Sequence, residues 1–124
     1  SDADVVAHAV ADALLGASSL GDLGMLFPSS DPRWVGANSM KLLTEVVQLF
    51  TDAGLVALHL DVTVVAEKVR VSPHRLDMRE NLAGALRVGV ERVSVKATTT
   101  YGLGFIGRDE GLAAVAVVTA APEG

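Results

Sequence analysis

The sequence predicts a two-layer α/β sandwich, in which helices cover one face of a mixed sheet. Three observations support this prediction. The chain has 124 residues, which is the length of a single domain with one core. Half of the residues (50%) are apolar. Segments with apolar residues at helical spacing alternate along the chain with segments in which every second residue is apolar.

Three segments have the spacing of helices that bury one face. The expected starts and ends are Ser1 to Gly16 or Gly21, Asn38 or Ser39 to Gly54, and Ser72-Pro73 to Gly89. The side chains expected to face the core are Val5, Val6, Val10, Ala13, Leu14, Leu42, Leu43, Val46, Val47, Phe50, Leu76, Ala83 and Leu86. Between the first two helices, the glycines and prolines of residues 17–37 predict a long loop.

Three segments predict strands, at residues 56–66, 93–98 and 111–121. In the first, one face is expected to carry Val56, Leu58, Leu60, Val62 and Val64, and the other His59, Asp61 and Thr63. In the second, Val93, Val95 and Ala97 alternate with Ser94, Lys96 and Thr98.

The composition excludes several classes of function. The formal charge of -5 disfavours non-specific binding to nucleic acid. The chain has no Cys, which excludes disulfide scaffolds and Cys-based zinc sites. The longest uncharged stretch, residues 111–122, is too short to span a membrane as a helix, and the first residues do not resemble a signal peptide. The absence of Cys is compatible with the cytosol, and we expect a cytoplasmic protein without nucleic-acid or membrane partners.

A polar stripe follows the first predicted helix. Asp4, His8 and Asp12 are spaced four residues apart, so they share one helix face. An imidazole with carboxylates one turn away can bind a divalent metal ion. From spacing alone, a solvated polar face is the more common arrangement, and a zinc site needs at least three protein ligands.

A second motif lies where a predicted strand ends. Residues 96–100 finish with three threonines and lead into the glycine-rich residues 101–108. Hydroxyls and unpaired backbone N–H groups at a strand end can donate to phosphate oxygens. Threonine is also an ordinary strand residue and glycine an ordinary turn residue, so the pattern leaves both interpretations open.

Two weaker motifs lie in predicted connections. Asp22, between two glycines, can accept hydrogen bonds from polyol hydroxyls, although a helix end and turn is the commoner use of such residues. Residues 68–73 place two cations and a helix start just after a strand, which also fits a solvated connection.

Taken together, these motifs resemble the 2-C-methyl-D-erythritol 2,4-cyclodiphosphate synthase family of the non-mevalonate isoprenoid route. The matching motifs run in family order along the whole chain. They are Ser1-Asp2-x-Asp4-x-x-x-His8, Asp12-Ala13-Leu14-Leu15-Gly16, Leu20-Gly21-Asp22-Leu23-Gly24, Leu26-Phe27-Pro28-x-x-Asp31-Pro32, Asp61-Val62-Thr63 and Pro73-His74. The most specific is Val95-Lys96-Ala97-Thr98-Thr99-Thr100 with Leu103-Gly104-Phe105-x-Gly107-Arg108-x-Glu110-Gly111.

The resemblance implies a metal-dependent phosphorus–oxygen lyase. Its substrate would be the cytidine diphosphate compound 4-diphosphocytidyl-2-C-methyl-D-erythritol 2-phosphate, and its products the cyclic diphosphate and CMP. The family is a homotrimer with active sites between neighbouring subunits. A zinc ion and a second divalent metal, magnesium or manganese, align the phosphates of the substrate.

The resemblance also implies roles for individual residues. His8 matches a zinc ligand, and Thr99 matches a catalytic residue that contacts the phosphate in the transition state. Ser1 matches a phosphate donor. The erythritol contacts and mobile substrate loop match Asp22, Leu23, Gly24, Phe27, Pro28, Ser29, Ser30 and Asp31. The cytidine segment matches Ala66, Glu67, Lys68, Val69, Arg70, Val71 and Ser72, and the remaining substrate contacts match Thr98, Thr100, Tyr101, Phe105 and Arg108.

The chain also departs from the family pattern. The family has an Asp-x-His on an earlier strand and a His directly before the position of Ser1, so we expect one domain over residues 1–124 that is N-terminally incomplete. Tyr101 stands where a metal-binding Glu is usual, Val69-Arg70 where Pro-Lys is usual, and Val115 where an acidic residue is usual. These departures leave an alternative function open, that of a catalytically inert trimeric homologue that binds cytidine nucleotides.

Overall fold

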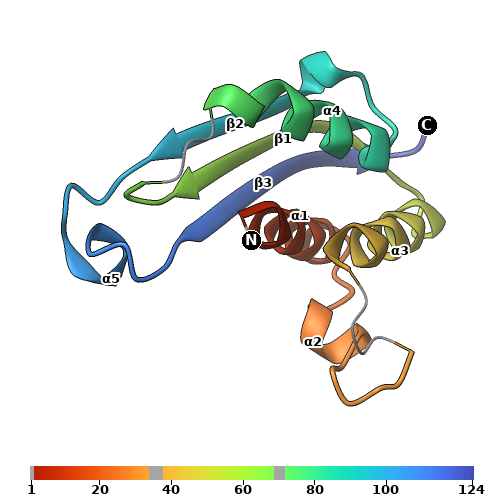
Figure 1. Cartoon of the computed structure of the whole chain (residues 1–124). Helices are drawn as coiled ribbons and strands as arrows, with labels where there is room; N and C mark the ends of the chain where they lie inside the picture. Colours follow the sequence, from red (N-terminus) through yellow and green to blue (C-terminus); the bar gives the residue numbers. More distant parts are fainter. Residues whose placement is uncertain (1, 34–37, 69–71) are drawn as a thin grey trace.

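The computed structural model describes residues 2–33, 38–68 and 72–124. These residues form a sheet with helices packed against one face (Figure 1), which confirms the predicted sandwich. The elements are α1 (Asp2–Ala17), α2 (Leu23–Leu26), α3 (Ser39–Asp52), β1 (Leu55–Val65), the 3-10 helix η1 (Ser72–His74), α4 (Arg75–Leu86), the 3-10 helix η2 (Val90–Arg92), β2 (Val93–Thr98), α5 (Gly104–Gly107) and β3 (Ala113–Pro122).

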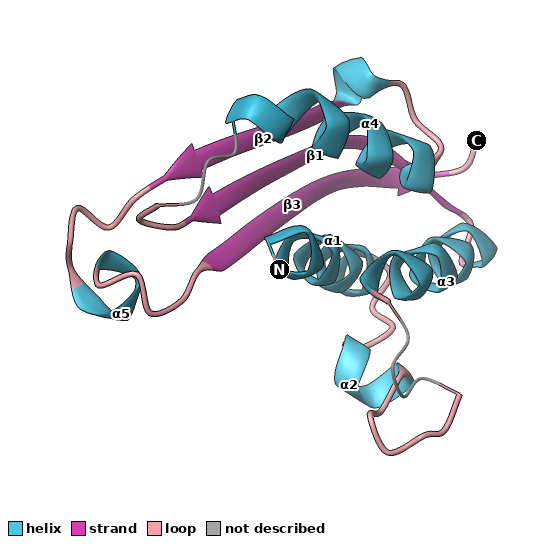
Figure 2. Cartoon of the chain, in the orientation of Figure 1, coloured by secondary structure: helices cyan, strands magenta, loops and turns pink. Residues whose placement is uncertain are grey.

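The sheet of the described residues is mixed and has the strand order β2-β1-β3 (Figure 2). β1 and β2 run parallel, with α4 in the connection between them, whereas β3 runs antiparallel to β1. Because parallel strands end at the same edge, Val65 at the end of β1 lies beside Thr98 at the end of β2. This edge carries many of the candidate substrate contacts.

One core lies between the sheet and the helices. The inner face of β1 buries Leu60, Val62 and Val64 at 0–1% exposure. They meet buried side chains of α1, α3, α4 and β2, among them Val10, Leu14, Leu15, Leu43, Val46, Phe50, Leu82, Leu86, Val93 and Val95. Alternation in the strands and helical spacing in the helices therefore predicted most of the core correctly.

A β-bulge corrects the prediction for the start of β1. The register between β1 and β3 shifts between Ala57 and His59, which leaves Leu58 as the extra residue. The shift exchanges the two faces of the strand, so Leu55 and Ala57 pack against the core. Val56 and Leu58, which were expected to share a face with Leu60, are both more than a third exposed.

The helices differ from expectation at several points. Leu76 is 56% exposed and does not line the core as predicted, and α4 ends at Leu86 with the left-handed Arg87 as its cap instead of ending at Gly89. The predicted long loop contains the short helix α2. Asn38 caps α3 as expected, because its side chain accepts a hydrogen bond from the Lys41 N–H. None of the described helices combines the length and apolar character needed to cross a membrane.

The other side of the sheet, the outer sheet face, has no helix against it in the described part of the chain (Figure 2). It carries His59, Asp61, Thr63 and Val65 of β1 with their partners in β2 and β3. Val115 and Val117 on β3 are 58% and 61% exposed there. A hydrogen bond and ion pair from Lys96, 2.9 Å away, hold the pKa of Asp61 below its usual range.

Candidate functional site

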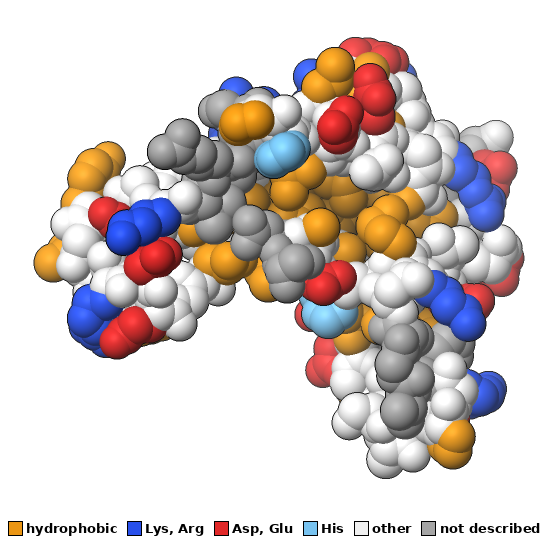
Figure 3. Space-filling model, viewed as in Figure 1, with side chains coloured by type: hydrophobic (Ala, Val, Ile, Leu, Met, Phe, Trp, Pro, Cys, Tyr) orange, Lys and Arg blue, Asp and Glu red, His pale blue; other side chains and the backbone are white. Residues whose placement is uncertain are grey.

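The described candidate residues fall into two groups, one on α1 and α2 and the other where β1 and β2 end. The helix half-site comprises His8 and Asp12 on α1 with Asp22 and Gly24 around α2. The strand half-site comprises the carboxyl ends of β1 and β2 and the turn through α5. In Figures 1 and 3 the α2 and α5 regions form two projections that point in different directions from the body of the molecule. The α2 segment and the turn through α5 therefore lie apart within one chain.

The helix half-site is built on the exposed imidazole of His8. Its Nε2 lies 3.1 Å from Oγ of Ser39, the first residue of α3. Nδ1 has no hydrogen-bond partner among the described residues. One ring nitrogen is therefore held by the protein, while the other can bind a ligand.

The imidazole fits a metal ligand, but the described residues do not complete a metal site. Within the described ranges, no three His, Asp or Glu side chains lie close enough to hold one ion. Asp4 and Asp12 share the α1 stripe with His8 without forming such a group. A zinc ion at His8 would have to take its other ligands from elsewhere.

Asp12 does not contact a metal-binding group among the described residues but anchors the start of α2. Its Oδ1 accepts a hydrogen bond of 3.1 Å from the N–H of Leu23. Asp22 then caps α2 with a bond of 2.9 Å from the N–H of Met25 to its own Oδ1. These two carboxylates join α1, which carries His8, to the segment that the resemblance assigns to the erythritol contacts.

The chain after α2 is the segment that the resemblance assigns to a substrate loop. Phe27 is half-buried against the core, whereas Ser29 and Ser30 are exposed. Asp31 accepts hydrogen bonds from the side chain and the backbone N–H of Arg33, the shortest being 2.8 Å. These bonds lower the pKa of Asp31 below its usual range. At neutral pH the loop therefore carries an ionised carboxylate paired with Arg33.

The strand half-site begins where the two parallel strands end. The N–H of Ala66 donates to the carbonyl of Thr98 over 3.0 Å, which ties the cytidine-matching segment to the threonines. Oε2 of Glu67 is buried without a hydrogen-bond partner. Lys68 is exposed. The predictions for Ser1, Val69, Arg70, Val71 and the side chain of Ser72 lie outside the described residues.

The threonines differ in their hydrogen bonds. Oγ1 of Thr99 accepts a bond of 2.9 Å from the N–H of Tyr101, which leaves the hydroxyl proton of Thr99 for a ligand. The hydroxyl of Thr100 instead donates to the carbonyl of Leu103 over 2.7 Å. Thr98 is exposed on the outer sheet face. Of the last two hydroxyls, Thr99 is therefore the better placed to donate to a phosphate.

A tight turn supports these residues. A side chain at Gly107 would overlap the backbone of Gly102, so the turn requires glycine there. The ring of Phe105 lies against Gly111, and Arg108 pairs with Glu110 over 2.8 Å. Tyr101 has a φ of 55°, and its side chain is 87% exposed. It presents a phenol where the family usually has a carboxylate.

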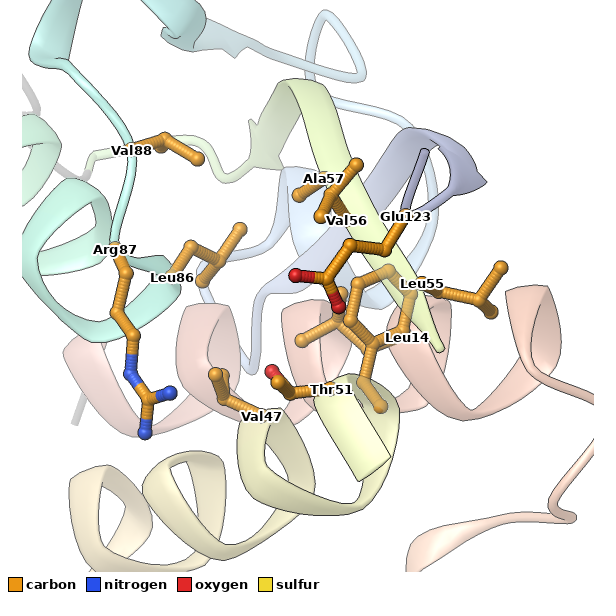
Figure 4. Close-up of a pocket in the computed structure, with 11 residues that line it drawn as sticks. Leu14, Val47, Thr51, Leu55, Val56, Ala57, Leu86, Arg87, Val88 and Glu123 are labelled. Atoms are coloured by element: carbon orange, nitrogen blue, oxygen red, sulfur yellow. The ribbon is translucent and has the colours of Figure 1, made fainter. Parts of the chain in front are cut away.

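A cavity lies away from both half-sites. It has a volume of about 180 Å³ and is found at the start of β1, between that strand, α3 and the end of α4 (Figure 4). Its lining is mostly apolar, with Arg87 and Glu123 as the charged members. None of the candidate site residues lines it.

Sequence reasoning missed two features of the helix half-site. The sequence predicts Ser39 only as a possible helix cap, whereas in the structure its hydroxyl contacts His8. The helical spacing predicts Asp12 as a possible metal-binding carboxylate beside His8, whereas in the structure it accepts a hydrogen bond from the Leu23 N–H. No signal in the sequence could have identified the contact between Ser39 and His8. A serine that caps a helix and a serine that contacts a neighbouring helix can both lie at a helix start.

These features define a two-layer α/β domain with a candidate phosphate site at the carboxyl edge of a parallel strand pair and an exposed imidazole on a separate helix. The chain belongs to the YgbB family, whose sequence model matches residues 1–121. It is 52% identical over 123 residues to a protein of Trichlorobacter lovleyi named 2-C-methyl-D-erythritol 2,4-cyclodiphosphate synthase, covering 99% of this chain and 78% of that protein. A Moorella thermoacetica protein of the same name is 54% identical over 95% of this chain and 72% of its own length.

Solved structures agree with this assignment. The bifunctional IspDF of Campylobacter jejuni matches 95% of this chain and 32% of its own with a TM-score of 0.90 and 39% identity. A 2C-methyl-D-erythritol-2,4-cyclodiphosphate synthase in its CDP-bound form matches 93% of this chain and 74% of its own with a TM-score of 0.85 and 33% identity. The resemblance found in the sequence is thereby confirmed.

Proposed function

We propose that this chain is the subunit of an enzyme that cyclises 4-diphosphocytidyl-2-C-methyl-D-erythritol 2-phosphate and releases CMP. An oxygen of the 2-phosphate forms a bond to the β-phosphorus, and the bond from that phosphorus to the CMP phosphate breaks. The shared name of the relatives and the CDP bound to a solved relative support this reaction. The observation on the chain itself that carries the proposal is the Thr99 hydroxyl, whose proton is free for a phosphate oxygen.

The residues of the chain would mainly position the substrate and stabilise charge, which is what phosphoryl transfer requires. Thr99 would donate to a phosphate oxygen on which charge increases during the reaction. Ala66, Glu67 and Lys68 would contact the cytidine at the end of β1. In the helix half-site, the oxygen of Asp22 that does not cap α2 would accept a hydrogen bond from an erythritol hydroxyl.

His8 is the described residue that we propose as a ligand of a divalent metal ion. Zinc bound there, and magnesium or manganese held with the diphosphate, would neutralise phosphate charge when bound. The exposed side chain of His8, whose Nε2 contacts Ser39, supports it as one ligand through Nδ1. The remaining ligands of the zinc would lie outside the described residues.

The proposal includes a homotrimer with each active site between two subunits. The separation of α2 from the turn through α5 in one chain supports it, because a second copy could bring its α2 segment beside that turn. The outer sheet face also supports it, since exposed Val115 and Val117 give the copies an apolar surface on which to pack. Val115 replaces an acidic residue usual in the family, so this surface is less charged here.

One observation favours a second candidate function. The exposed Tyr101 offers no carboxylate for a metal ion beside the threonines. A trimeric homologue that binds cytidine nucleotides without turnover would tolerate this change.

One experiment separates the two candidates. The protein is incubated with the substrate and with zinc and magnesium, while ³¹P NMR follows the cyclic diphosphate and CMP. Binding of CMP is measured in parallel by calorimetry. Formation of both products supports the enzyme, CMP binding without products supports the binding homologue, and the absence of both contradicts the two proposals together.

A further inference from the structure

We propose that the cavity at the start of β1 binds a small primary amine, whose ammonium group contacts the carboxylate of Glu123 and whose apolar body of about six carbons fills the cavity. The site is separate from both half-sites and does not depend on the proposed function. Glu123 also lies outside residues 1–121, which the family's sequence model matches, so membership of the family does not imply the site.

The cavity offers an apolar space of defined size. Its volume is about 180 Å³, and the buried side chains of Leu14, Val47, Phe50 and Leu86 form part of its lining. An engineered apolar cavity of about 150 Å³ in another protein stays free of water and binds benzene. The cavity of this chain therefore has room for a hydrocarbon ring or branched chain of about six carbons.

The lining also carries free hydrogen-bond acceptors. In Figure 4 the carboxylate of Glu123 points toward the middle of the cavity. Within the described ranges, neither this carboxylate nor the hydroxyl of Thr51, which also lines the cavity, has a hydrogen-bond partner. The backbone N–H of Glu123 donates to the carbonyl of Gly54 over 2.7 Å, which fixes the residue beside the start of β1. A free carboxylate favours a ligand that donates hydrogen bonds and carries a positive charge.

Arg87 is the other charged residue of the lining, and it would favour the opposite ligand, a carboxylate. Its guanidinium, however, donates a hydrogen bond of 3.2 Å to Oε1 of Gln48, which is not part of the lining. Figure 4 shows the guanidinium well separated from the carboxylate of Glu123. Because the arginine is engaged with Gln48 and the glutamate has no partner, the charge at this cavity favours an amine.

Three probes that share one ring and differ in the attached polar group test the proposal. They are cyclohexylmethylamine, cyclohexylmethanol and cyclohexanecarboxylate. Binding to the whole chain is followed by the methyl NMR signals of Leu14, Val47 and Leu86. We expect saturable shifts with the amine, an affinity for the amine about 3–10-fold higher than for the alcohol, and the weakest binding for the carboxylate.

Two variants test the part played by Glu123. Glu123→Gln keeps the size of the side chain and removes its charge, so it should lower the affinity for the amine about 3–10-fold and leave that for the alcohol unchanged. Glu80→Gln is the matched control. It removes an exposed carboxylate of α4 that does not line the cavity, and the affinity for the amine should stay the same.

Several results would overturn the proposal. They are an affinity for the alcohol or the carboxylate that equals or exceeds that for the amine, methyl shifts confined to residues outside the lining, and no binding of any probe. An unchanged affinity for the amine in Glu123→Gln, or an equal loss in Glu80→Gln, would overturn it as well.

Discussion

The backbone N–H of Tyr101 donates a hydrogen bond to Oγ1 of Thr99 over 2.9 Å. Tyr101 reaches this position with left-handed backbone geometry, which only a few per cent of non-glycine residues adopt. In this bond the Thr99 oxygen is the acceptor, so the hydroxyl proton of Thr99 remains available for a ligand. The hydroxyl of Thr100 instead donates a hydrogen bond to the carbonyl of Leu103. Two neighbouring hydroxyls thus have different chemical capacities.

Replacement of Thr99 should therefore affect turnover more than nucleotide binding. Thr99→Val removes a donor whose effect grows as charge builds on the phosphate, so we expect kcat to fall about 10²–10³-fold. The affinity for CMP should fall far less, and Thr99→Ser should keep most of the activity. Steady-state kinetics and CMP titration measure the two effects, and equal losses in both would show that Thr99 only anchors the nucleotide.

Much of the strand half-site could be predicted from the sequence, because a threonine-rich strand end next to glycines is a local pattern. The difference between Thr99 and Thr100 could not, because it depends on the backbone of Tyr101, and tyrosine does not signal a left-handed turn. The bulge at Leu58 could not be predicted from the sequence either, because it also depends on the backbone and not on residue type. An alternating apolar run continues through it, and only pairing with β3 reveals the shift.

The helix half-site depended more on tertiary structure. The spacing of His8 and Asp12 correctly placed both on one face of α1, but spacing could not show that Asp12 bonds to Leu23 and His8 contacts Ser39. These partners lie 11 and 31 residues away along the chain. Leu76 shows that helical spacing alone does not decide burial either. The residue fits the spacing of a core-facing position but is exposed in the structure.

Gly107 should tolerate no side chain. In Gly107→Ala the new methyl group would overlap the backbone of Gly102, so the turn after β2 would have to open. We expect CMP affinity and turnover to fall together while the core stays folded. Gly84→Ala is the control, because it fills open space within α4 and should raise the free energy of unfolding by about 1 kcal/mol. Unaltered CMP binding in Gly107→Ala would contradict the role of this turn.

Asp12 should hold α2 in place for the substrate. Asp12→Ala removes the acceptor of the Leu23 N–H, with a cost of about 0.5–1.5 kcal/mol. Hydrogen exchange at the Leu23 amide should become faster and KM should rise. Asp12→Asn keeps an oxygen at this position. The Leu23 amide should therefore exchange more slowly in Asp12→Asn than in Asp12→Ala. If the Leu23 amide exchanges at the same rate in Asp12→Ala and in the unaltered protein, Asp12 does not anchor α2.

The Asp31–Arg33 pair should make the segment after α2 sensitive to acid. Because hydrogen bonds from Arg33 lower the pKa of Asp31 in the folded chain, the ionised carboxylate stabilises this segment at pH values above the unfolded pKa. That stabilisation is lost as pH falls through the lower, folded value. Arg33→Met should bring the pKa of Asp31 back toward its ordinary value, as measured by NMR titration of the carboxyl group. Arg92→Met, which removes an arginine bonded to the Leu58 carbonyl instead, should leave that pKa in place.

The most direct test of the account is activity in mixed assemblies of two inactive variants. His8→Ala damages the helix half-site and Thr99→Val the strand half-site, so each variant alone should form little product. If each active site joins half-sites from two subunits, random assembly of equal amounts leaves about a quarter of the sites with both halves intact. We therefore predict that co-assembly restores roughly a quarter of the unaltered activity. Mixed assemblies that stay as inactive as the separate variants would contradict an active site shared between subunits.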